Sequence, residues 1–116
     1  MSVQGTYIGN VATPQSVVIS GTSKNDIVTA PDDSLTVAAI SVANDTAGAI
    51  VCKLYWFRSS NSTDYLYWEN SVAANSTAIV SDIPIRLAAG DKIKAVGNTG
   101  VCITAINLIN LPFGVR

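Results

Sequence analysis

The carboxylates are the first groups to consider for acid–base chemistry, because the chain has eight of them. Catalysis by two carboxyl groups needs both held at a defined separation with their pKa values pushed apart. Asp32 and Asp33 are adjacent in a proline-containing turn, whereas Asp64 and Glu69 flank one short expected strand. Asp91 stands alone in another expected turn. No two carboxylates are expected to converge, so the sequence predicts no catalytic residue.

Nucleophilic and metal-assisted chemistry is also disfavoured by the composition. The chain contains no histidine, so a Ser–His–Asp relay is impossible, and neither Lys24 nor Lys53 lies in a serine–lysine motif. The two cysteines, Cys52 and Cys102, cannot complete a tetrahedral metal shell by themselves. We expect free, buried thiols, with a disulfide between them as the alternative. The sequence predicts no enzyme activity, no cofactor and no metal.

The aromatic residues carry the main functional signal, because six of the eight lie between residues 55 and 68. On a hairpin with strictly alternating side chains, Trp56 and Trp68 would face the core. The opposite face would then carry four further rings, those of Tyr55, Phe57, Tyr65 and Tyr67. An exposed aromatic band is typical of a contact surface. Two alternatives are an N-terminal segment that covers the band and a platform on which sugar rings stack.

Short apolar runs separated by Gly, Asn, Asp, Ser and Pro predict an all-β fold. Strands are expected at residues 17–19, 27–28, 35–44, 49–57, 64–69, 76–81, 83–87, 91–96 and 101–110, with a hairpin loop at 97–100. The apolar phase shifts between Ala38 and Ile40, which predicts a bulge, and Pro84 restricts its segment to an edge or kinked strand. Seven to nine short strands in one domain favour an antiparallel β-sandwich that is jelly-roll-like.

Two regions are expected within this domain. Residues 1–34 would form an N-terminal arm or a pair of edge strands, and residues 35–116 the sandwich core with a short C-terminal tail. A second set of expected contact residues comes from these ends: Val17, Val18, Ile19 and Phe113. If the first region is an arm, deletion of residues 2–20 should leave residues 35–111 folded.

Charge and hydropathy exclude several classes of partner. The formal net charge of −1 with scattered basic residues argues against nucleic-acid binding. No apolar run approaches the roughly 18 residues that a membrane span needs, so we expect no membrane partner. The N-terminus has neither a basic region nor a long apolar stretch, which predicts synthesis in a cytoplasm.

The stretch from Leu35 to Leu111 resembles small β-sandwich virion proteins encoded by tailed bacteriophages. Three segments carry the resemblance: LTVAAISVANDTAGAIVCKLYW, VAANSTAIVSDIPIRLAAGDKIKAVG and VCITAINLINL. The stretch from Leu35 to Leu111 covers about two thirds of the chain, and residues 1–34 lie outside the match.

The resemblance implies a non-enzymatic virion protein, made in the host cytoplasm and placed on the capsid surface. Such proteins commonly act as capsid decoration or cement proteins and are often homotrimers. The expected partners are further copies of the chain and the major capsid protein or another virion protein. A component of the neck, tail or baseplate is the first alternative, and a carbohydrate-binding module is the second.

Overall fold

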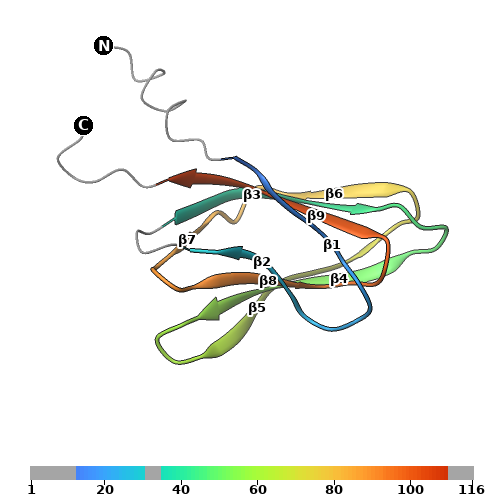
Figure 1. Cartoon of the computed structure of the whole chain (residues 1–116). Coiled ribbons are helices and arrows are strands. Elements are labelled where there is room, and N and C mark those ends of the chain that lie inside the picture. Colours follow the sequence, from blue (N-terminus) through green and yellow to red (C-terminus); the bar gives the residue numbers. More distant parts are fainter. Residues whose placement is uncertain (1–12, 31–34, 110–116) are drawn as a thin grey trace, which may run out of the picture.

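The computed structural model describes residues 13–30 and 35–109, and these residues form strands and loops without a helix (Figure 1). The strands are β1 (Gln15–Val18), β2 (Asn25–Thr29), β3 (Leu35–Asn44), β4 (Ile50–Arg58), β5 (Thr63–Val72), β6 (Ser76–Val80), β7 (Ile85–Leu87), β8 (Lys92–Val96) and β9 (Val101–Ile109). Valine, isoleucine and aromatic residues dominate several of these segments, and such side chains suit a pleated, half-buried surface. None of the described residues forms a helix of the length and apolarity that a membrane span requires.

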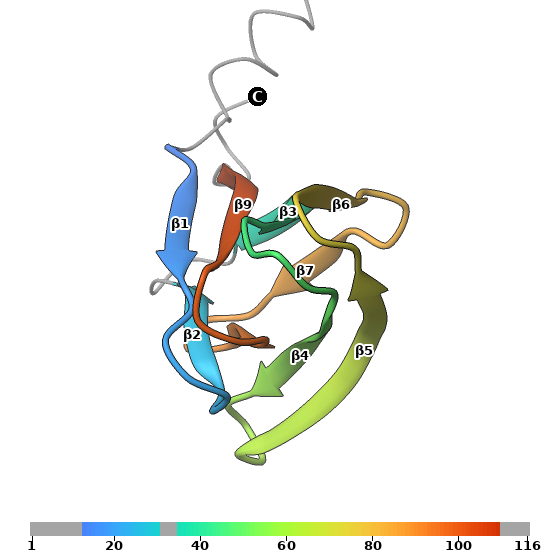
Figure 2. The ribbon, with the colours of Figure 1, turned by 90° about the vertical axis from the view of Figure 1, so that its right-hand side faces the viewer.

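The strands form two antiparallel sheets that face one another. Sheet A has the order β1-β9-β3-β6, with β7 paired to β3 on the same edge as β6, and sheet B has the order β2-β8-β4-β5. In the end view of Figure 2, β1 lies beside β2 on one side of the sandwich and β6 beside β5 on the other. Most connections cross from one sheet to the other, and the first described strand pairs with the last. This connectivity is that of a jelly roll, with β6 and β7 sharing one edge position.

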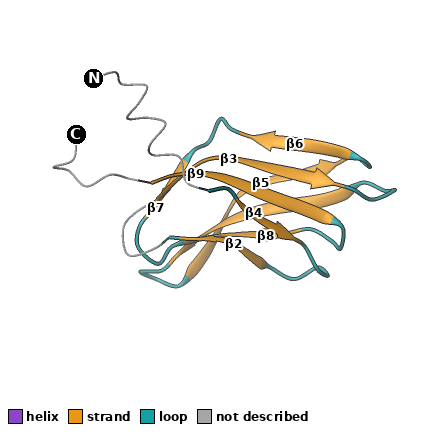
Figure 3. Cartoon of the chain, turned by 45° about the horizontal axis from the view of Figure 1, so that its top comes forward, coloured by secondary structure: helices purple, strands orange, loops and turns teal. Residues whose placement is uncertain are grey.

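The hydrophobic core fills the space between the sheets. Alternate residues of the central strands are buried, including Val42 on β3, Leu54 on β4, Ile93 on β8 and Ile103 on β9. This period of two is the one that a strand with one core-facing side requires. The loops gather at the two ends of the sandwich (Figure 3).

The expected fold class is confirmed, and several expected strands coincide with observed ones. β3 has the predicted bounds, and its pairing with β9 shifts register between Val37 and Ala39, which confirms the predicted bulge. β7 follows Pro84 and pairs with β3 alone, as an edge strand does. The predicted hairpin loop at residues 97–100 is wrong, because β8 belongs to sheet B and β9 to sheet A.

The N-terminal region forms edge strands over its described residues. β1 pairs with β9 at the edge of sheet A, and β2 pairs with β8 at the edge of sheet B. Ile19, Ile27, Val28 and Ala30 belong to the buried core cluster. Residues 13–30 are therefore part of the sandwich, and a deletion of residues 2–20 would remove both β1 and the buried Ile19. The stability of residues 35–111 without them stays a prediction.

Candidate functional site

The β4–β5 hairpin carries the aromatic cluster, and a bulge interrupts its alternation. Leu54 pairs with Trp68, whereas the next residue, Tyr55, pairs with Leu66. Tyr67 is therefore the extra residue on β5. Directly opposed residues of an antiparallel pair share a face, so the bulge changes which face each ring occupies.

The four rings expected on one outward face lie in different places. Tyr55 and Phe57 are on the outer face of sheet B, whereas Tyr65 is opposite Trp56 on the inner side, with the two ring centroids 5.4 Å apart. Tyr67 packs against the core, and burial raises the pKa of its phenol. The expectation of a single aromatic band is wrong, because it assumed that side chains alternate strictly along β5, and the bulge at Tyr67 breaks this alternation.

Lysine side chains cover the two rings of the outer face of sheet B. The Lys24 ammonium lies 4.4 Å from the centroid of the Tyr55 ring. The Lys94 and Lys92 ammonium groups lie 4.4 and 5.8 Å from the centroid of Phe57. These are cation–π distances, and the lysines come from the β1–β2 loop and from β8. Lysine side chains of the chain itself thus lie over both rings.

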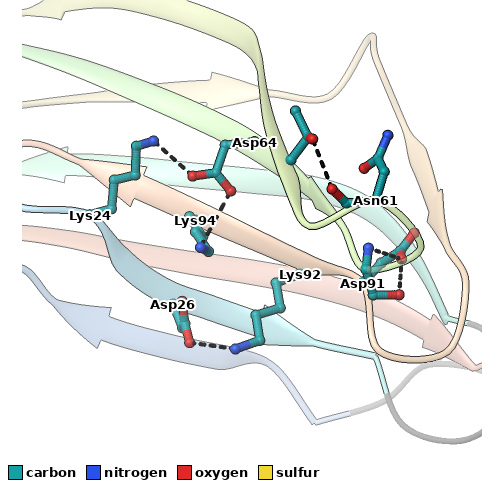
Figure 4. Close-up of polar contacts among 9 residues, drawn as sticks. Lys24, Asp26, Asn61, Asp64, Asp91, Lys92 and Lys94 are labelled. Atoms are coloured by element: carbon teal, nitrogen blue, oxygen red, sulfur yellow. Dashed lines mark hydrogen bonds and ion pairs between the residues drawn. The ribbon is translucent and has the colours of Figure 1, made fainter.

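Two carboxylates pair with the same lysines (Figure 4). Asp64 places Oδ2 at 2.7 Å from Lys24 Nζ and Oδ1 at 3.3 Å from Lys94 Nζ. Asp26 Oδ2 lies 3.1 Å from Lys92 Nζ. The hydrogen bond from Lys24 lowers the pKa of Asp64, and the same bond raises the pKa of Lys24. The outer face of sheet B is therefore a charged surface whose ions largely neutralise one another.

Asp91 is a buried carboxylate whose bonds tie loops together. Its Oδ2 accepts hydrogen bonds from Trp56 Nε1 at 3.1 Å and the Ala88 amide at 3.2 Å. Its Oδ1 accepts from the amide and the hydroxyl of Ser59, each at 3.0 Å. Burial would raise the pKa of Asp91, but these hydrogen bonds outweigh it and lower the pKa. The sequence showed only an aspartate after a glycine, a pattern that does not distinguish this anchor from an ordinary turn.

The outer face of sheet A has the opposite character, because its two complete cross-strand rows are uncharged. One row is Val18, Cys102, Ala43 and Thr77, and the next is Ser16, Thr104, Ser41 and Ile79. Ile106 opposite Ala39 continues the surface. Val18, Ile79 and Ile106 are 66%, 64% and 37% exposed. Arg86 on β7 brings a charge to one end of this face.

The candidate contact residues near the chain ends also differ in their exposure to solvent. Val18 is exposed on the outer face of sheet A, and Val17 is half-buried against the core. Ile19 is 1% exposed and is inaccessible to a partner, which corrects its assignment as a contact residue. Phe113 lies outside the described residues.

The described residues contain no group of three metal-ligating side chains that could hold an ion. Cys52 is buried and Cys102 half-buried, and both are free thiols. One shallow hollow beside the β3 bulge does not admit a water molecule. Its lining is apolar apart from one phenol: Val37, Ala38, Ala39, Ile40, Tyr67, Val80 and Ile83. The contrast between the two outer faces is thus the feature that bears most on function.

No protein-family model matches this chain, and a search of curated proteins gives no match.

Proposed function

We propose that this chain is a non-enzymatic structural protein of a bacteriophage particle, a decoration or cement protein of the head shell. It would act by burying the outer face of sheet A against neighbouring protein subunits. The uncharged character of the two cross-strand rows of this face is the observation that carries the proposal. The assignment to a bacteriophage particle rests on the sequence resemblance to virion proteins of tailed bacteriophages.

The physical argument is the difference in desolvation between the two faces. Burying an ion in an interface costs several kcal/mol unless its partners and hydrogen bonds are restored. The rows of sheet A contain no ion, and exposed Val18 and Ile79 gain by leaving water. Burial of the outer face of sheet B would instead remove water from several lysine and carboxylate ions at once. Sheet A therefore suits the subunit contact and sheet B the solvent side.

The alternatives fit the described surfaces less well. A glycan-binding platform needs free aromatic faces, whereas the ammonium groups of Lys24 and Lys94 lie over Tyr55 and Phe57. A neck, tail or baseplate component would use the same uncharged face but in a ring of few copies. The number of copies per particle separates that alternative from a shell protein.

The test compares one lysine substitution on each outer face. Ile79→Lys places a charge on sheet A, and Leu66→Lys places one at a comparably exposed site on sheet B, since the two residues are 64% and 50% exposed. Particles are purified from cells that produce each variant, washed at high salt and assayed by quantitative mass spectrometry. We expect the Leu66→Lys chain to be retained like the wild type. The Ile79→Lys chain should fall by about tenfold or more, as burial of an unpaired charge requires.

Two results would overturn the proposal. One is a wild-type chain that does not co-sediment with particles. The other is loss of the Leu66→Lys chain with retention of the Ile79→Lys chain, which would place the contact on sheet B. Circular dichroism of both purified variants checks that each remains folded.

A further inference from the structure

Among the described strands, the sandwich has four edges with no further strand beside them, and three of these edges carry features that oppose pairing with another chain. Edge strands are commonly protected by bulges, charges and prolines. β5 has the Tyr67 bulge and two carboxylates, and β2 has a register shift between Asp26 and Val28. The β6 and β7 strands share one edge of sheet A, and Pro84 lies in the segment between them. β1 is short, but its four residues are uncharged and its register with β9 is regular.

The backbone of β1 presents hydrogen-bonding groups at this edge. The Ile19 amide donates to the Val101 carbonyl at 2.8 Å, so this pair is a hydrogen-bonded one. Hydrogen-bonded and non-hydrogen-bonded pairs alternate along an antiparallel ladder, which makes Ser16 and Val18 the non-bonded residues. The direct contact between the Ser16 and Thr104 hydroxyls agrees, because side chains are closer in such pairs. The N–H and C=O groups of Ser16 and Val18 therefore point away from β9.

We infer that β1 pairs antiparallel with β1 of a second copy of this chain, across a two-fold axis at Val17. In this register Ser16 of each copy lies opposite Val18 of the other, and each such pair exchanges both of its N–H···O bonds. A register centred on Ser16 would instead place Pro14, which has no N–H, opposite Val18. The two A sheets would become one continuous sheet.

The side chains are compatible with this pairing. Ser16 and Val18 lie on the outer face of sheet A, so the uncharged face continues from one copy into the next. No charged residue of β1 approaches its counterpart, and a two-fold interface requires such self-complementarity. The inference rests on the proposed function and deepens it, because a dimer presents twice the uncharged area to a shell. It favours a dimer over the trimer that the sequence resemblance implies.

Val18→Pro tests the pairing with little effect on the sandwich. Proline at position 18 removes one of the two N–H groups of β1 that point outward and leaves the β1–β9 hydrogen bonds, and edge strands tolerate proline at such positions. Val18→Ala is the matched control, since it keeps the N–H and removes the same exposed side chain. Light scattering over a dilution series should give twice the chain mass for the wild type and for Val18→Ala. Val18→Pro should give the mass of a single chain, with an unchanged circular dichroism spectrum.

Amide hydrogen exchange of the wild-type chain provides a second readout that needs no variant. The amides of Ser16 and Val18 should be protected at high protein concentration and should lose protection on dilution. The Val17 amide, which faces β9, should be protected at both concentrations.

A dimeric Val18→Pro chain, a trimeric or monomeric wild type, or unprotected Ser16 and Val18 amides in a dimer would each overturn the pairing. None of these results would affect the proposed function, which depends on co-sedimentation with particles and on the Ile79→Lys comparison. Conversely, a chain that dimerises through β1 but is absent from particles would overturn the proposed function alone.

Discussion

At the scale of single residues, Asp91 shows how a buried carboxylate can stabilise a fold by tying its loops together. Its two oxygens accept hydrogen bonds from Trp56, Ser59 and Ala88, and no second carboxylate takes part in these bonds. The acceptor ties the start of the β4–β5 loop to the turn before β8. Because these bonds require the ionised carboxylate, its contribution depends on pH.

We expect Asp91→Asn to lower the free energy of unfolding at neutral pH by about 2 kcal/mol or more, because the new NH₂ group faces donors. The lowered folded-state pKa of Asp91 makes its contribution complete above the unfolded value of about 3.9. In the acid range below that value the unfolded state binds more protons, so stability falls as pH falls through the folded pKa. Urea unfolding as a function of pH measures both effects, and Asp91→Asn should flatten the acid slope.

Asp45→Asn is the matched control, because Asp45 is exposed in the β3–β4 turn. It should change the free energy of unfolding by less than about 0.5 kcal/mol. An Asp91→Asn chain as stable as this control, with an unchanged acid slope, would show that the four hydrogen bonds contribute nothing.

At the scale of elements, the turns that cross between the sheets depend on one another. Gly100, in the β8–β9 turn, has a φ of 101°, and a Cβ there would lie 2.6 Å from Thr46 Cγ2 in the β3–β4 turn. Thr46 is itself held by Asn44, whose buried side chain also donates to the carbonyls of Gly48 and Val72. Two connections that are distant in sequence thus share one packing site.

Gly100→Ala should therefore destabilise the sandwich by about 2 kcal/mol or more, through left-handed strain and the clash with Thr46. Gly48→Ala should be close to neutral, since a Cβ there has no atom within 4 Å. Adding Thr46→Ser removes the clashing methyl and keeps the hydroxyl, so the double variant should regain part of the loss. Denaturant unfolding of the wild type and of these three variants measures the losses, and equal losses for Gly100→Ala and Gly48→Ala would contradict the packing argument.

The strands were predictable from the sequence because their signals are local. Apolar alternation and turn residues placed β3 and β6 closely, and the phase shift near Ala38 revealed a bulge. The bulge at Tyr67 was not predictable, because its aromatic neighbours are apolar on both faces and show no break in alternation. The hydrogen bonds of Asn44 were not predictable either, because its partner Val72 lies far along the chain.

At the scale of the whole molecule, long-range pairing decides the two outer faces. β4 and β5 are the only consecutive described strands that pair with each other, so a prediction of hairpins fails for every other pair. The uncharged rows of sheet A join residues of β1, β9, β3 and β6, which no local pattern relates. The contact surface that we propose was therefore not predictable from local sequence patterns, whereas the aromatic cluster lies within one hairpin and was visible in the sequence.

The same topology makes β1 part of the cooperative fold, and two adjacent residues test this. Ile19 is 1% exposed in the core and Val18 is 66% exposed on the surface. Ile19→Ala should lower the free energy of unfolding by about 2–5 kcal/mol, as removal of buried methyl groups does. Val18→Ala should change it by less than about 0.5 kcal/mol. Urea unfolding, measured below the concentration at which the chain associates, separates folding from dimer formation.

If both substitutions were neutral, β1 would be an appendage whose detachment leaves the core intact. A large loss for Ile19→Ala alone would show that the strand that we propose to join two copies is anchored in the core of each.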